Sequence, residues 1–199
     1  MTETTSTTPT AASSTSETSA ADLGWTSRVL VTGEAAQLMR RLAAEHGDLM
    51  FHQSGGCCDG SSPMCYVQGE FIVGDRDVLL GTLAIGTGDE SGGPDSADPA
   101  DIPVWISGSQ YEAWKHTQLI LDVVPGRGGG FSLESPTGMR FLTRSRVIPP
   151  EREASLPAII TGSDVEGGTP LPDGVAPIDL PDTLPGEICD PVTGRPVQN

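Results

Sequence analysis

The segment His52–Tyr66, HQSGGCCDGSSPMCY, concentrates the residues of this chain that could do chemistry. It holds three of the four cysteines together with one histidine, and glycine recurs through its first half. Thiolates are nucleophiles and soft metal ligands, and glycine lets a backbone turn sharply and approach a ligand closely. We therefore expect this segment to be a loop that presents sulfur atoms.

A metal site is the first hypothesis for this loop. Cys57, Cys58 and Cys65 would supply thiolates and His52 an imidazole, with the glycines bending the chain so that neighbouring thiols converge. The spacing is not Cys-x-x-Cys, so it matches no standard zinc signature. Iron, an iron–sulfur cluster, zinc and copper all suit such ligands.

Two other interpretations of the loop stay open. In one, a thiol is a nucleophile: backbone N–H groups after the glycines would lower the pKa of Cys57, whereas Asp59 would raise that of Cys58. His52 or His116 would then serve as the base. In the other, the segment is a glycine turn with buried, weakly reactive thiols.

Composition divides the chain into three parts. Residues 1–24 are almost all small and polar, and we expect a disordered tail without the basic and apolar regions of a signal peptide. Residues 25–148 form the expected domain, and residues 149–199 are predicted to be a mostly disordered acidic tail rich in Pro and Gly. Cys189 lies in that tail and is left out of the site.

The charge of the chain excludes some functions. The formal net charge is −16, and most of it falls in the two terminal parts. Without a basic stripe for phosphates we expect no nucleic-acid binding, and without a long apolar run we expect no membrane span. Four cysteines without a signal peptide indicate a reducing, cytoplasmic location.

Apolar spacing predicts the elements that must position the loop. One amphipathic helix is expected over 33–46, with Thr32 as its N-cap and Gly47 at its end. A short helix after Ser107 or Ser109 should contain Tyr111 and Trp114. Short strands are expected at 29–31, 49–52, 70–73, 77–83, 104–106, 119–124, 131–134 and 140–144, with a solvated loop at 86–103. This pattern predicts an α+β fold with a small mixed or antiparallel sheet.

A second glycine-rich segment covers residues 126–130, GRGGG. It lacks the Gly-Lys-Ser/Thr ending of a Walker A loop, and no helix follows it as a dinucleotide fingerprint requires. Arg127 has the chemistry to hold an anion. The segment is interpreted mainly as a flexible turn before Phe131.

Three stretches carry a resemblance to a known family. LMFHQSGGCCDGSSPMC at 49–65, WKHT at 114–117 and DVVPGRGGGFSLE at 122–134 closely resemble the bacterial family called domain of unknown function 779. The resemblance covers about residues 28–148. Members of that family are often encoded near aldehyde or alcohol dehydrogenases, so the resemblance implies an accessory role in that metabolism.

A more distant resemblance is to the HesB-type iron–sulfur carriers. TGEAA at 32–36, GGC at 55–57 and GFSLESP at 130–136 follow the order and approximate spacing of that family's segments. The resemblance implies a HesB-like domain that associates into homo-oligomers. The Cys-x-Cys pair that ends the carrier domain is missing, because residues 141–147 contain no cysteine.

The sequence therefore predicts a non-enzymatic protein: a thiol- and metal-binding accessory of aldehyde or alcohol oxidation. Cys57 and Cys65 are its leading ligands, Cys58 is a third ligand or redox partner, and His52 is the fourth. The alternatives are an enzyme whose thiolate forms an adduct with an aldehyde, and a module that docks on a dehydrogenase without metal.

Overall fold

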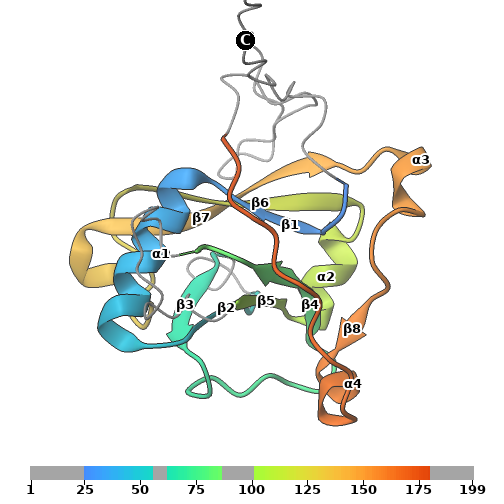
Figure 1. Cartoon of the computed structure of the whole chain (residues 1–199), viewed down its shortest axis with the longest axis horizontal. Helices are drawn as coiled ribbons and strands as arrows, with labels where there is room; N and C mark the ends of the chain where they lie inside the picture. The colour runs from blue at the N-terminus through green and yellow to red at the C-terminus, as the bar shows by residue number, and fades with distance from the viewer. Residues whose placement is uncertain (1–24, 56–61, 87–100, 180–199) are drawn as a thin grey trace, which may run out of the picture.

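The computed structural model describes residues 25–55, 62–86 and 101–179 (Figure 1). Its order of elements is β1 (Val29–Val31), α1 (Gly33–His46), β2 (Leu49–Gln53), β3 (Met64–Val67), β4 (Val78–Leu83), β5 (Ile102–Ile106), α2 (Gly108–Trp114), β6 (Thr117–Pro125), the 3-10 helix η3 (Ser135–Thr137), β7 (Met139–Val147), α3 (Pro150–Glu153), β8 (Ile160–Thr161) and α4 (Gly162–Glu166). The fold is α+β, as predicted.

The strands form two sheets. One has the order β1-β6-β7, with β1 and β6 parallel and β6 and β7 antiparallel over nine residue pairs. The other has the order β3-β2-β5-β4-β8 and is antiparallel except for the parallel pair β2 and β5. Figure 1 shows the first sheet above the second, with α1 at one side of both.

The core lies between the sheets and is closed by α1. Thr32 caps this helix by accepting the N–H of Ala35, and the apolar face predicted from the 3.6-residue spacing is buried. Phe51 of β2 and Phe141 of β7 meet edge to face, with ring centroids 4.9 Å apart. One apolar core therefore holds the two sheets together.

The segment after β8 ties the sheets to each other. Val175 makes a parallel bridge to Leu83 at the end of β4, and Ile178 makes one to Thr32 beside β1. Figure 1 shows this orange segment running across both sheets. The elements α3, β8 and α4 and the two bridges thus lie beyond residue 148, the domain boundary that composition indicated. Composition placed the boundary too early because Pro and Gly separate the short apolar patches that pack on the sheets.

Two predicted strands are wrong. Residues 70–73 follow a turn that ends at Glu70 and form no strand: Phe71 packs on other rings, and Ile72 is 89% exposed. Residues 131–134 are a turn leading into η3, with Phe131 87% exposed. β2 pairs on one side with β3, a strand that was not predicted, and on the other with β5. β5 begins at Ile102, within the stretch expected to be a loop.

Candidate functional site

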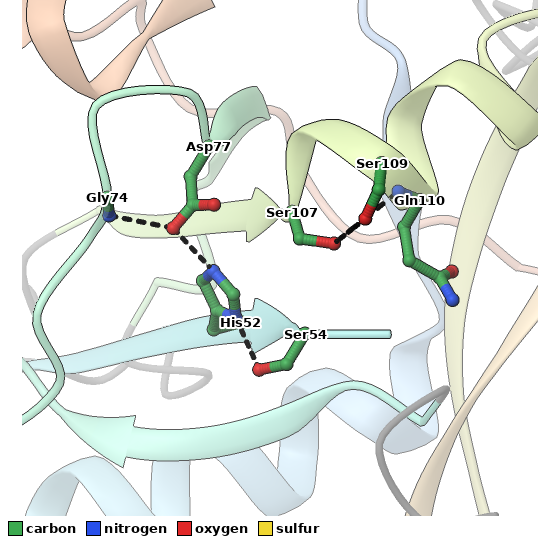
Figure 2. Close-up of polar contacts among 7 residues, drawn as sticks. All are labelled: His52, Ser54, Gly74, Asp77, Ser107, Ser109 and Gln110. Atoms are coloured by element: carbon green, nitrogen blue, oxygen red, sulfur yellow. Dashed lines mark hydrogen bonds and ion pairs between the residues drawn. The ribbon is translucent and has the colours of Figure 1, made fainter. Parts of the chain in front are cut away.

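His52 is the centre of the polar contacts near the cysteine loop. Its Nε2 lies 2.9 Å from Oδ2 of Asp77, and its Nδ1 lies 2.8 Å from Oγ of Ser54. The same Asp77 oxygen accepts the N–H of Gly74 at 2.8 Å. The ring of Phe71 packs against the imidazole at a centroid distance of 4.3 Å. Figure 2 shows His52 between the carboxylate and the hydroxyl.

The topology of the five-stranded sheet brings these groups together. The parallel strands β2 and β5 end next to each other, so Ser54 follows one strand and Ser107 follows the other. β4 is antiparallel to β5, and Asp77 stands just before it at the same end of the sheet. Polar groups beyond the carboxyl ends of parallel strands are a common place for a ligand site.

The contacts fix which nitrogen of His52 carries the proton. A carboxylate only accepts hydrogen bonds, so Nε2 must donate to Asp77. The second nitrogen, Nδ1, then keeps its lone pair and accepts the hydroxyl of Ser54. Burial lowers the pKa of His52 below its usual value, although the hydrogen bond and charge of Asp77 oppose this shift. The lowered pKa favours the neutral imidazole at pH 7, with the Nδ1 lone pair directed at the hydroxyl of Ser54 at the start of the cysteine loop.

The lowered pKa of His52 makes stability depend on pH. Since the unfolded chain binds this proton more readily, the free energy of unfolding should fall as the pH drops below about 6.5. We expect His52→Gln to remove this part of the slope. Urea unfolding at pH values from about 5 to 7.5 would measure it, with His46→Gln as the exposed control. Equal slopes for the wild-type chain and His52→Gln would contradict the buried neutral state.

Cys65 does not share this site. It pairs with Phe51 across β2 and β3, whereas His52 pairs with Met64, so the two candidate ligands point to opposite faces of the sheet. Cys65 has no exposed surface and belongs to the apolar core. Burial, and then the negative charge of Glu134, raises the pKa of its thiol. The structure thus does not bring His52 and Cys65 together, and it gives Cys65 the features of a core residue.

We expect Cys65 to resist alkylation in the folded chain. Iodoacetamide needs an accessible thiolate, and this thiol is neither exposed nor easily ionised. Mass spectrometry of a Cys57→Ser, Cys58→Ser, Cys189→Ser variant would then show no label until urea is added. Rapid labelling of the folded variant would restore Cys65 as a candidate ligand.

The other predicted site residues have different positions. Cys57, Cys58 and Cys189 lie outside the described residues. His116 is exposed in the turn between α2 and β6, and its carbonyl accepts the N–H of Ile148. Among the residues that the structure describes, no group of three or more His, Cys, Asp or Glu side chains is arranged to hold a metal ion. Nor do the described helices include one long and apolar enough to cross a membrane.

Sequence reasoning missed Asp77 and Ser54. Asp77 is 25 residues from His52 along the chain, and only the pairing of β4 with β5 brings it near. Ser54 lies within the segment His52–Tyr66, but the sequence alone indicates no partner for its hydroxyl. The signal that was available is the i, i+2 spacing of His52 and Ser54, which places both on one side of an extended chain.

The end of the second glycine-rich segment and the residues that follow it, 129–134, pack on β3. Oγ of Ser132 accepts the N–H of Cys65 at 2.8 Å and donates to the buried carboxylate of Glu134, while the N–H of Leu133 donates to the carbonyl of Cys65. A Cβ on Gly129 would lie 3.1 Å from Sδ of Met64. This segment therefore covers the free edge of β3 where the chain returns from the cysteine loop.

Gly108, the first residue of α2, packs against the backbone beside Asp77. A Cβ there would lie 2.5 Å from the carbonyl oxygen of Arg76, so Gly108→Ala must push this backbone aside. We expect it to cost about 1–3 kcal/mol in urea unfolding. Gly130→Ala is the matched control, because its Cβ would meet nothing within 4 Å. A neutral Gly108→Ala would show that α2 and Arg76 are not in close contact.

Comparison with known proteins identifies the middle of the chain. The family model with the description Domain of unknown function (DUF779) matches residues 38–147, which include the cysteine loop, β2 to β7 and the polar contacts of His52. Neither the curated proteins nor the solved structures contain a match. The HesB-like topology thus stays a prediction.

Proposed function

This chain belongs to the DUF779 family, and from that premise we propose that it is a thiol- and metal-binding accessory protein of aldehyde or alcohol oxidation. The ligands in this proposal are His52, through Nδ1, and the thiolates of Cys57 and Cys58. Cys65 drops out of the ligand set that the sequence indicated, because it points into the core.

The observation that carries the proposal is the state of His52. A metal-bound histidine usually donates its other ring N–H to a carboxylate, which fixes the tautomer and makes the ligating nitrogen more basic. Asp77 accepts the Nε2–H of His52 in this way, leaving Nδ1 with a lone pair. Ser54 occupies the position beside Nδ1 at 2.8 Å, where an incoming metal ion would replace its hydroxyl.

The position of His52 at the base of the cysteine loop supports the same conclusion. The chain leaves β2 one residue after His52 and returns at Met64, the residue that pairs with His52. Cys57 and Cys58 follow Ser54 by only three and four residues, within about 11–14 Å of extended chain. Two thiolates and one imidazole are a set that suits zinc, copper or iron.

Metal titration of the full chain, purified without oxygen, tests the proposal. We expect one equivalent of Zn²⁺ in competition with a chromophoric chelator, and loss of that binding in a Cys57→Ser, Cys58→Ser variant. Cys65→Ala is the matched control, which removes a thiol from the opposite face of the sheet and should bind as the wild type does. Full metal content in the Cys57, Cys58 variant would exclude the proposed ligands.

A second candidate function uses the same geometry. Asp77 and His52 have the order of an orienting carboxylate and a base, and the Ser54 hydroxyl beside Nδ1 marks where a group that gives up its proton would stand. In this candidate His52 removes a proton from the loop thiol Cys57, the sulfur attacks an aldehyde carbon, and the carbonyl oxygen takes the proton to give a hemithioacetal. The pH dependence of iodoacetamide labelling discriminates: a thiol that reacts well below pH about 8 in metal-free protein favours this candidate.

A further inference from the structure

A hollow of about 290 Å³ lies between the last turn of α1 and the segment that joins β6 to β7. Figure 1 shows these two parts of the chain next to each other at one side of the molecule. Leu42, Leu133 and Pro136 contribute apolar surface to the hollow, and Glu45 and His46 stand at the helix end. An apolar cavity of about 150 Å³ already accommodates a benzene ring, so the hollow has room for one aromatic side chain.

Phe131 stands at the rim of this hollow and is 87% exposed. The backbone that carries it is fixed, because the next residue, Ser132, is buried and bonded to Cys65 and Glu134. The hydroxyl of Ser135 donates to the carbonyl of Gly129, which closes the turn around Phe131. The ring is therefore an exposed aromatic on a rigid support, which is a typical anchor of a protein interface.

Exposed charges of opposite sign lie on the two segments of the chain that form the hollow. Arg127 is exposed and is the only charged residue between 126 and 133, so the segment with Phe131 is basic. The helix end on the other side of the hollow carries Glu45, whose side chain is 74% exposed. A surface with a projecting ring at the rim of an apolar hollow, and with opposite charges on the two segments that form the hollow, can pair with a second copy of itself under a two-fold rotation.

We propose that this face is the interface of a symmetric homodimer, in which Phe131 of each copy enters the hollow of the other. Arg127 of each copy then lies against Glu45 of its partner. The ionic contact fixes the orientation of the two copies, while burial of the two rings supplies most of the affinity. The dimer is independent of the proposed metal site, since its residues do not touch His52 or Asp77.

Sedimentation of the full chain across micromolar concentrations tests the dimer. We expect a wild-type dimer whose dissociation constant rises by roughly 30-fold or more in Phe131→Ser, the effect of losing one aromatic anchor. Ile72→Ser, which removes an equally exposed side chain elsewhere, should sediment as the wild type does. Circular dichroism of each variant checks that the fold is kept.

Charge reversal gives the second arm of the test. Arg127→Glu and Glu45→Arg should each weaken the dimer, because each places like charges against each other in both copies of the contact. The double variant should restore the dimer, because a negative residue 127 then faces a positive residue 45 in both contacts. A wild-type chain that is monomeric at every concentration would overturn the proposal and leave the hollow to another partner. A dimer that Phe131→Ser leaves unchanged would overturn it as well, by placing the interface elsewhere.

Discussion

Replacing Asp77 with alanine is expected to weaken metal binding by about 10- to 100-fold, the usual loss when the carboxylate behind a histidine ligand is removed. Asp77 holds the Nε2–H of His52 at 2.9 Å and thereby directs Nδ1 to the loop. Without it, either nitrogen can carry the proton, and the ring is free to turn. The pKa of His52 should fall further, because both effects of Asp77 raise it.

Stability should fall in the same variant. The Nε2–H of buried His52 loses its acceptor, and an unpaired buried donor costs about 1–3 kcal/mol. The N–H of Gly74 loses the same acceptor but is exposed, so water replaces that hydrogen bond. Asp77→Asn is the matched control, because an amide oxygen can accept both hydrogen bonds without the charge. Chelator competition and urea unfolding measure the two effects. Wild-type metal affinity in a folded Asp77→Ala chain would mean that Asp77 does not support a ligand.

Replacing Phe141 with alanine is expected to cost about 3–5 kcal/mol of folding stability. This ring has 1% exposure and meets Phe51 edge to face, so the variant leaves a cavity where the two sheets join. Urea unfolding measures the loss, and Phe141→Leu should recover most of it by filling the volume. Metal affinity of the folded fraction should stay close to that of the wild type, because Phe51 faces away from the His52 side of β2. A cost under about 1 kcal/mol would contradict the joint core.

The local signals in the sequence located the helices well. The apolar face of residues 33–46, the cap at Thr32 and the stop at Gly47 predicted α1 with its observed bounds, and Ser107 does cap α2. Such features depend on neighbours within one or two turns, which the sequence displays directly. The long apolar runs of β4 and β6 were found for the same reason.

The sequence could not reveal contacts that the sheet creates. Glu70–Val73 has the apolar, aromatic and β-branched composition of a strand, but Phe71 packs on His52 and Tyr66, so tertiary packing overrides the local pattern. The same limit applies to the site. His52 was identified from its type and position, whereas Asp77 became its partner through the pairing of β4 with β5 and β5 with β2.

Cys65 shows why clustering in sequence misled the ligand assignment. It lies only thirteen residues from His52 along the chain, and a sequence without strand register allows them to converge. The antiparallel register of β2 and β3 instead places Cys65 opposite Phe51 and Met64 opposite His52. The Cys65 and His52 side chains therefore lie on opposite faces of the sheet. A shift of one residue in register would have reversed this result.

Nitrogen NMR of the histidine rings, with and without one equivalent of Zn²⁺, tests the central claim about His52 most directly. The chain has three histidines, and His52→Gln identifies the signals of interest. In the metal-free chain we expect a neutral ring with the proton on Nε2, and on zinc addition a shift of Nδ1 with the Nε2 proton retained. A proton on Nδ1, or His52 signals that zinc leaves unchanged, would contradict the account.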